Sequence, residues 1–208
     1  MPFGLGPAPR VFTKILKPVV GFLQQQGLRL VVYLDDILII GSSEVETRKA
    51  VKMVVDLFEF LGFVIQLEKS VTEPSQSLEY IGLVVDANAM SFTLPLGKKE
   101  SLLVQCNKAY KSKTLTLREL ASLLGILNWA SQSVEYASAH YRHLQASYTR
   151  NVHLAHGDLS STITLSGEAR EAKSDLNWWI KRAKFQVGRS ISASAPSITI
   201  FSDASLSG

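Results

Sequence analysis

The feature that most constrains the fold is a pair of adjacent acidic residues inside the most apolar stretch of the chain. Residues 28–41 read LRLVVYLDDILIIG, so that only Asp35 and Asp36 separate the strand-like runs 29–34 and 37–40. Two short runs of β-branched and aliphatic residues joined in this way predict a tight β-hairpin. Such turns prefer Asn-Gly or Asp-Gly. The tendency to form turns therefore does not explain the two acids.

Adjacent carboxylates at the tip of a buried hairpin repel each other and lose hydration. Either one of them takes up a proton or a cation binds beside them. Hard divalent ions such as Mg²⁺ prefer carboxylate oxygens, usually one or two together with substrate phosphates. A pair of such ions promotes phosphoryl transfer. The alternative is a surface hairpin whose acids face water, which is the commoner situation for an isolated Asp-Asp turn.

Composition narrows the class of protein. The chain has 208 residues, of which 46% are hydrophobic, so it can bury a core. Its net charge of +4 permits a nucleic-acid partner, although a solvated Lys/Arg surface is the commoner cause. The single cysteine, Cys106, excludes an internal disulfide and favours an intracellular location, cytoplasmic or nuclear. The start MPFGLGPAPR lacks a signal peptide, and residues 28–41 are too short to cross a bilayer, so neither secretion nor membrane insertion is expected.

The first 86 residues predict an α+β layer with helices against an antiparallel sheet. Residues 7–27 have apolar positions at helical spacing, and Pro18 inside them predicts a kink or break. Ser43 and Glu46 form a capping box that opens a helix ending at Leu61. Further strands are expected at 63–67 and 78–86.

The rest of the chain predicts mainly helices. Residues 97–149 have helical periodicity, with a second capping box at Thr116 and Glu119. Residues 150–166 are rich in Ser, Thr and His and predict a loop, and a further helix is expected at 167–183. After a linker at 190–196, a last strand is expected to end on Asp203.

The tetrad YLDD between two apolar strands resembles the Tyr-x-Asp-Asp motif of reverse transcriptases. Other segments resemble further blocks of retroelement reverse transcriptases in the same order. These are MPFGLGPAPRVFTKIL (1–16), LGFVIQLEKS (61–70), the primer-grip hairpin LEYIGLVV (78–85), the thumb helix TLRELASLLGILNWAS (116–131) and the opening ribonuclease H strand ITIFSDASLSG (198–208). The Phe-Gly of the first block and the NWW run (177–179) favour a retrotransposon of DIRS or gypsy type.

The resemblance implies an RNA-directed DNA polymerase. The expected reaction is two-metal nucleotidyl transfer to a primer 3′-hydroxyl, with Mg²⁺ or Mn²⁺ as cofactor. The expected partners are an RNA template, a DNA primer or RNA–DNA hybrid, and a dNTP. The implied domains are a partial palm (1–86), a helical thumb (87–149), a connection with one helix (150–196) and the start of a ribonuclease H-like domain (197–208).

The resemblance also implies roles for single residues. Asp35 would be the main metal ligand and Asp36 the second carboxylate, while Lys69 would donate a proton to the leaving pyrophosphate. The remaining expected site residues contact nucleic acid or nucleotide, or begin the ribonuclease H site. They are Pro2, Phe3 and Gly4 beside the incoming nucleotide, Tyr33 and Leu34 along the template–primer track, Tyr80, Ile81 and Gly82 in the primer grip, and Asp203 as the first ribonuclease H carboxylate.

One departure from the family pattern matters for activity. The family's metal site needs another aspartate, on a strand upstream of the Pro-Phe-Gly block, and this sequence begins at that block. The 208-residue chain alone is therefore expected to be inactive in primer extension. The alternative reading is a non-catalytic transposon relic, or a co-opted module that binds nucleic acid or protein.

Other polar and aromatic residues carry weaker expectations. His140, His143, His153 and His156 form two pairs at i,i+3 spacing, but surface or phosphate-facing roles are favoured over Zn²⁺ binding. Basic residues on the predicted thumb favour phosphate contact or simple solvation; they are Lys98, Lys99, Lys108, Lys111 and Lys113. The tryptophans 129, 178 and 179 fall on apolar helical faces, which favours the core over base stacking.

Overall fold

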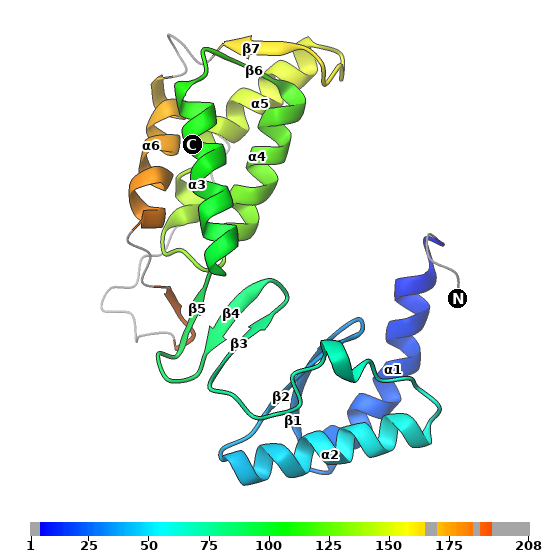
Figure 1. Cartoon of the computed structure of the whole chain (residues 1–208). Coiled ribbons are helices and arrows are strands. Elements are labelled where there is room, and N and C mark those ends of the chain that lie inside the picture. The colour runs from blue at the N-terminus through cyan, green and yellow to red at the C-terminus, as the bar shows by residue number, and fades with distance from the viewer. Residues whose placement is uncertain (1–4, 165–169, 185–187, 193–208) are drawn as a thin grey trace, which may run out of the picture. The chain divides into compact units, whose positions relative to one another are not determined.

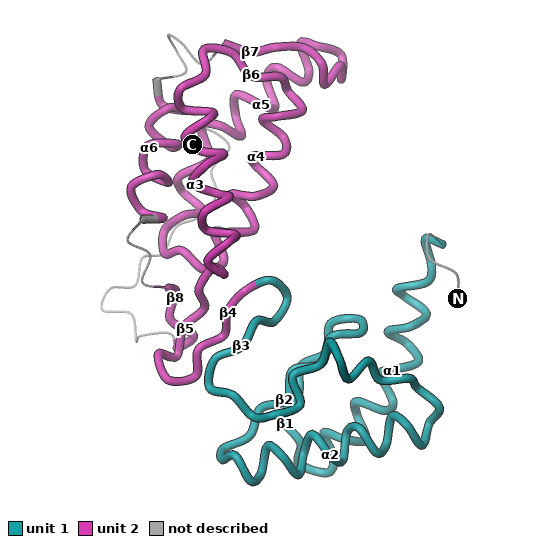
Figure 2. Tube along the Cα trace, viewed as in Figure 1, with its two compact units in different colours: residues 1–82 teal, residues 83–208 magenta. Residues whose placement is uncertain are grey.

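The structure is a computed structural model that describes residues 5–164, 170–184 and 188–192 (Figure 1). The chain divides into two units, residues 1–82 and 83–208 (Figure 2). Within the described part of the chain, no helix combines the length and the apolar character that crossing a membrane requires. The domain boundaries implied by the family resemblance stay a prediction.

The first unit is built from two helices and a hairpin. Its elements are α1 (Ala8–Gln25), β1 (Arg29–Tyr33), β2 (Asp36–Ile40), α2 (Glu44–Phe60), the short 3₁₀ helix η1 (Leu67–Lys69) and β3 (Ser77–Tyr80). Strands β1 and β2 pair antiparallel, with Arg29 opposite Ile40 and Tyr33 opposite Asp36. The predicted hairpin is therefore present, with Leu34 and Asp35 as its turn and Asp36 as the first residue of β2.

The hydrophobic core of this unit lies between the helices and the hairpin. Helix α1 contacts β1 and helix α2 contacts β2. The core contains Leu16 and Leu23 from α1, Leu30 from β1, and Val54 and Phe58 from α2. Side chains alternate along β1, so that Val31 and Tyr33 on its other face remain half exposed.

Local sequence signals explain both helices. Ser43 caps α2 by accepting a hydrogen bond from the backbone N–H of Glu46, as the capping box predicts. The expected break at Pro18 is wrong, because α1 runs continuously through that residue. Pro18 lies on the exposed side of α1, where water can satisfy the carbonyl that loses its partner.

The strand expected at 63–67 is also wrong. This segment follows the end of α2 without regular structure and then enters η1. Phe63 and Ile65 pack against the core of the unit, whereas Val64 is 97% exposed. The alternating apolar pattern of residues 63–67 thus arises because Phe63 and Ile65 pack against the core of the unit.

The second unit combines helices with two small sheets. Its elements are β4 (Leu83–Asp86), β5 (Ser91–Thr93), α3 (Leu96–Lys111), β6 (Thr114–Thr116), α4 (Leu117–Ala130), η2 (Ala137–Ala139), α5 (Arg142–Leu154), β7 (Thr162–Thr164), α6 (Arg170–Lys184) and β8 (Arg189–Ser190). Strand β5 pairs antiparallel with both β4 and β8, and β6 pairs antiparallel with β7. Helix α6 packs on α3 and α5, and α5 packs on α4.

The core of the second unit is large and mainly aliphatic. Trp179 is fully buried in it, and the same cluster includes the buried Leu102, Leu120 and Leu144. The prediction that Trp179 belongs to the core is confirmed. Cys106 is buried in this cluster, and burial raises the pKa of its thiol to about 12.

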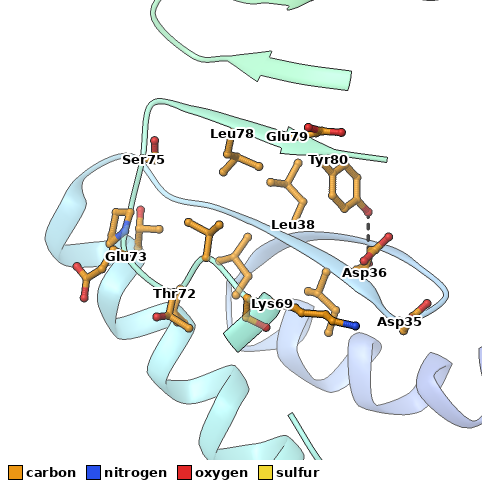
Figure 3. A pocket seen from close by; sticks show the side chains of 17 residues that line it. Asp35, Asp36, Leu38, Lys69, Thr72, Glu73, Ser75, Leu78, Glu79 and Tyr80 are labelled. Carbon is orange, nitrogen blue, oxygen red and sulfur yellow. Dashed lines mark hydrogen bonds between the residues drawn. The ribbon is translucent and has the colours of Figure 1, made fainter. Parts of the chain in front are cut away.

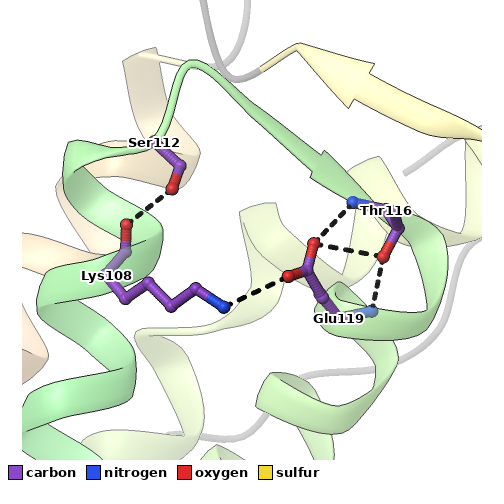
Figure 4. Close-up of polar contacts among 4 residues, drawn as sticks. All are labelled: Lys108, Ser112, Thr116 and Glu119. Atoms are coloured by element: carbon purple, nitrogen blue, oxygen red, sulfur yellow. Dashed lines mark hydrogen bonds and ion pairs between the residues drawn. The ribbon is translucent and has the colours of Figure 1, made fainter.

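The capping box at Thr116 and Glu119 is complete, whereas at Ser43 only the bond from the Glu46 N–H is present and the Glu46 carboxylate accepts from Ser42 instead. The Thr116 hydroxyl accepts a hydrogen bond from the Glu119 N–H at 3.1 Å, and the Glu119 carboxylate accepts one from the Thr116 N–H at 3.0 Å (Figure 4). The Lys108 ammonium lies 3.3 Å from the same carboxylate. These bonds hold the pKa of Glu119 below its usual value, the backbone bond being the largest cause.

The predicted boundaries differ from the structure in several places, and residues 97–149 contain strand β6 and η2 between their α-helices. Helix α5 and strand β7 occupy parts of residues 150–166, which the composition predicted as a loop. The strand expected at 78–86 is divided into β3 and β4 by a turn at Ile81 and Gly82. Both turn residues have positive φ, 50° and 76°, which ends a strand.

Candidate functional site

The two acids sit where a strained turn presents them to solvent. Leu34, the first residue of the turn, has φ of 53°, a region that residues other than glycine rarely adopt. The turn leaves both Asp35 and Asp36 exposed. The expectation that the acids lose hydration at the tip of a buried hairpin is therefore wrong, because one face of this hairpin is open.

A pocket of about 230 Å³ lies beside the turn (Figure 3). Asp35, Asp36 and Lys69 line it together, and Figure 3 shows the Lys69 ammonium directed towards Asp35. The sequence places Lys69 more than thirty residues after the acids, and η1 brings it back to them. The volume is below the roughly 300 Å³ at which pockets begin to enclose small-molecule ligands.

Strands β2 and β3 and the segment between them form the other walls. Leu38 contributes an apolar wall, while Thr72, Ser75 and Glu73 contribute polar groups (Figure 3). Glu73 forms an ion pair with Arg48 of α2, which holds the loop between η1 and β3 against the helix. Both partners are largely exposed, so the pair contributes little to stability.

Tyr80 connects β3 to the hairpin. Its hydroxyl lies 3.2 Å from the carbonyl oxygen of Val31 and 3.4 Å from that of Asp36, so that it donates to one or shares its proton between both (Figure 3). Burial raises the pKa of the Tyr80 phenol, and the negative charge of Asp36 raises it further. The next residue, Ile81, is 44% exposed at the turn. The alternation of residues along β3 does not indicate that the Tyr80 hydroxyl bonds to the hairpin.

The structure brings together only part of the predicted site. Asp35, Asp36, Lys69 and Tyr80 line one pocket, with Tyr33 and Leu34 beside it in the hairpin and Ile81 and Gly82 after Tyr80. Pro2, Phe3, Gly4 and Asp203 lie outside the described residues. Among the side chains described, no group of three His, Cys, Asp or Glu is arranged to hold a metal ion.

Two of the four histidines contact helix α6, whereas His153 and His156 are exposed. The His143 ring lies between two carboxylates of α6, with its Nδ1 3.1 Å from Asp175 and its Nε2 3.6 Å from Glu171. The bond to Asp175 raises the pKa of His143. His140 stacks on Trp178 with ring centroids 3.9 Å apart. Sequence spacing could not find these partners, because they lie on another helix.

A second hollow lies between α3 and α4. Its volume is about 630 Å³, and its lining residues are Lys98, Ser101 and Gln105 from α3 with Ser122, Gly125, Ile126 and Trp129 from α4. We call it the α3/α4 groove. A Cβ added at Gly125 would meet nothing within 4 Å, so the groove is open at this point. Trp129 is only partly buried and lines the groove, unlike Trp179.

The comparisons with known proteins agree with this arrangement. Residues 1–85 match the family model "Reverse transcriptase (RNA-dependent DNA polymerase)". "Uncharacterized protein K02A2.6" of Caenorhabditis elegans is 30% identical over 135 residues, which are 65% of this chain and 10% of that protein. The chain thus spans about a tenth of its curated relative.

Solved structures of foamy viral protease-reverse transcriptase have a similar fold. The complex with dsDNA gives a TM-score of 0.64 at 18% identity, over 95% of this chain and 36% of the viral chain. The complex with RNA/DNA hybrid gives 0.63 at 17% identity, over 91% and 22%. The fold class predicted from the sequence, α+β, is confirmed. Residues 1–85 are thus similar in sequence to the reverse transcriptase family, and the chain has a fold similar to that of foamy viral protease-reverse transcriptase.

Proposed function

We propose that this chain takes part in RNA-directed DNA synthesis, as the carboxylate-bearing part of a polymerase site. One observation carries the proposal: Asp35 and Asp36 are exposed together at a hairpin turn, with Lys69 in the same pocket. This arrangement lies inside the segment that has the family's sequence pattern. Nucleotidyl transfer needs carboxylates beside the reacting phosphate and a group that protonates the leaving pyrophosphate.

The residues present suit a divalent ion. Mg²⁺ is usually held by one or two carboxylates and completes its coordination with water and substrate phosphates, and Asp35 and Asp36 offer such a pair in contact with solvent. Reverse transcriptases generally use divalent ions. When bound here, Mg²⁺ or Mn²⁺ would supply positive charge for the α-phosphate and the attacking 3′-hydroxyl. In this proposal Asp35 is the principal ligand and Asp36 the second.

The other predicted residues have supporting roles in this proposal. Lys69 protonates the departing pyrophosphate, and Tyr33 and Leu34 lie beneath the primer terminus. The turn formed by Ile81 and Gly82, after Tyr80, holds the primer strand. Pro2, Phe3 and Gly4 beside the nucleotide, and Asp203 as a ribonuclease H carboxylate, rest on the sequence resemblance alone. So do the palm, thumb and connection segments, whereas a location inside the cell rests on the single cysteine.

An RNA–DNA hybrid is the proposed partner of the α3/α4 groove. The related viral structures are titled as complexes with dsDNA and with RNA/DNA hybrid. Lys98 at the groove can neutralise a phosphate, and Trp129 offers an aromatic surface to the sugar or base edge. Lys108 is a weaker candidate than the sequence predicted, because it is paired with Glu119.

Binding of Mn²⁺ followed by NMR tests the metal site. Mn²⁺ broadens the signals of nearby nuclei, so the first amide signals to be lost should be those of residues 34–37. Asp35→Asn should remove this selective broadening. Asp56→Asn, an exposed aspartate of α2 paired with Lys52, is the matched control and should leave it unchanged. Broadening that starts elsewhere, or that survives Asp35→Asn, contradicts the proposal.

A further inference from the structure

Tyr80 occupies a special place in the first unit, because its side chain touches both strands of the acid-bearing hairpin. It is the last residue of β3, and its hydroxyl lies within hydrogen-bond distance of Val31 on β1 and Asp36 on β2. These acceptors are 49 and 44 residues away in the sequence. The bond therefore closes a long loop onto the end of the hairpin that carries the two acids.

The hairpin needs such support. Leu34 holds a positive φ without being glycine, so the turn is not the most stable conformation of its own sequence. One face of β1 is exposed, and Tyr33 is 55% exposed beside the turn. Packing of apolar side chains therefore cannot restrain this end of the hairpin from that face. A hydrogen bond to the carbonyl of Asp36 restrains the backbone at the residue itself.

We infer that Tyr80 is a positioning residue for Asp35 and Asp36: its hydroxyl donates its one proton to the carbonyl of Val31 or Asp36, or shares it between them, and thereby sets the direction of the two carboxylates. The inference rests on the proposed function, since it deepens the role of the same site. It also assigns Tyr80 a task beyond holding a primer strand. A residue that only packed beneath the hairpin would need its ring and not its hydroxyl.

The same residue joins two functional segments. Ile81 and Gly82, the predicted primer-holding turn, follow Tyr80 directly and have positive φ. A displacement of that turn would move the Tyr80 hydroxyl relative to the hairpin carbonyls. The position of the acids thus depends on the position of the segment proposed to hold the primer.

The test compares Tyr80→Phe with the unchanged 208-residue chain. This variant keeps the ring and removes only the hydroxyl. We expect the ¹³C carbonyl signals of Val31 and Asp36 to move upfield, as they do when a hydrogen bond is lost. We also expect Mn²⁺ to bind about 10-fold more weakly, at the lower end of the ~10–100-fold loss that follows removal of an outer-shell partner. Tyr136→Phe is the control, because Tyr136 is a 76% exposed tyrosine that belongs to the second unit.

Each outcome decides the inference. Unchanged carbonyl signals in Tyr80→Phe would overturn it, because the hydroxyl would then not hold the hairpin. It also fails if Tyr80→Phe retains the Mn²⁺ affinity that Asp35→Asn loses. If Asp35→Asn itself binds Mn²⁺ as the unchanged chain does, the proposed function fails, while the carbonyl signals still decide whether Tyr80 holds the turn.

Discussion

At the scale of single residues, the site depends on one close approach of backbone segments. Gly41 follows β2 directly, and a Cβ at this position would lie 3.0 Å from the backbone nitrogen of Thr47 in the first turn of α2. That nitrogen donates a hydrogen bond to the Ser43 carbonyl, so it cannot withdraw without loosening the helix start. A glycine at the end of the acid-bearing strand is thus a structural requirement.

Gly41→Ala should destabilise the first unit. We expect the free energy of unfolding to fall by about 1–3 kcal/mol, which is typical when atoms are inserted where no space exists. Gly21→Ala is the matched change, because a Cβ there meets nothing within 4 Å. It should raise the free energy of unfolding by about 0.5–1 kcal/mol, since alanine favours a helix interior over glycine. Chemical denaturation measures both, and equal effects of the two variants would contradict this account.

Residue roles divide into those that the sequence could and could not predict. The adjacency of Asp35 and Asp36, and the turn around them, follow from local pattern alone. The contacts of Tyr80 with Val31 and of His143 with Asp175 could not be predicted. They join residues 49 and 32 positions apart, and only the packing of the elements brings them together. The exposure of the two acids depends in the same way on which face of the hairpin the helices cover.

At the scale of elements, helix α5 begins on a buried acid from another helix. The Asp175 carboxylate, 4% exposed, accepts hydrogen bonds from the backbone N–H groups of His143 at 3.0 Å and Leu144 at 3.3 Å. It thereby caps α5 from α6, in place of a capping residue within α5 itself. The His143 ring lies against the same carboxylate, so the α5–α6 contact includes a group that titrates near neutral pH.

The stability of the second unit should therefore depend on pH through His143. The folded-state pKa of His143 is raised by Asp175 above the unfolded value of about 6.5, so its contribution is complete below that value. The contribution is lost as the pH rises through the folded-state pKa. His143→Gln should lower the unfolding midpoint more at pH 5.5 than at pH 8.5.

His153→Gln serves as the control for this pH dependence. His153 is an exposed histidine of the same helix, and the effect of His143→Gln is compared with that of His153→Gln at both pH values. The His143 ring is itself 51% exposed, so solvent screens the interaction and a small effect is expected. A His143→Gln effect that is the same at both pH values would show that the ion pair adds nothing.

Capping residues give a second prediction at this scale. Thr116→Ala removes the side chain that caps α4 and should lower the free energy of unfolding by about 1 kcal/mol. Lys108→Ala removes only an exposed ion pair with Glu119 and should cost less than about 0.5 kcal/mol. Urea denaturation of the two variants distinguishes the contributions. A larger loss for Lys108→Ala would mean that the ion pair and not the cap holds the start of α4.

Sequence signals were most reliable where they act within one element. Both capping boxes mark real helix starts, because Ser43 and Thr116 bond to backbone groups only three residues away. The strand expected at 63–67 failed because strand formation requires a partner, and alternating apolar residues do not supply one. The break predicted at Pro18 is absent, because the free-energy cost of proline in a helix is smaller where the affected turn faces water.

At the scale of the whole molecule, the proposed function rests on two features of the chain. One is the carboxylate pair beside Lys69 in the first unit, and the other is the α3/α4 groove in the second. The groove is the harder of the two to predict. Its lining comes from two helices, α3 and α4, that follow one another in the sequence. The sequence does not distinguish Lys98 from the other lysines of the predicted thumb.

Hybrid binding provides the last prediction. The affinity of the chain for a short RNA–DNA hybrid should fall as salt rises, because phosphate contacts release bound counterions. Lys98→Ala should lower the affinity and make it less dependent on salt, since one phosphate contact is lost. Trp129→Ala should lower the affinity by about 1–3 kcal/mol if its ring stacks on a base or sugar, with the salt dependence unchanged. Lys181→Ala, an exposed lysine of α6, is the control.

Fluorescence anisotropy at several salt concentrations measures all four proteins. Lys98→Ala removes a charge and Trp129→Ala removes an aromatic surface. The two effects on affinity together therefore distinguish a groove that binds nucleic acid from a surface that is only basic. If Lys98→Ala and Lys181→Ala weaken binding equally while Trp129→Ala has no effect, net charge alone explains the affinity. A groove that binds the hybrid requires the Trp129 effect, because that loss cannot come from charge.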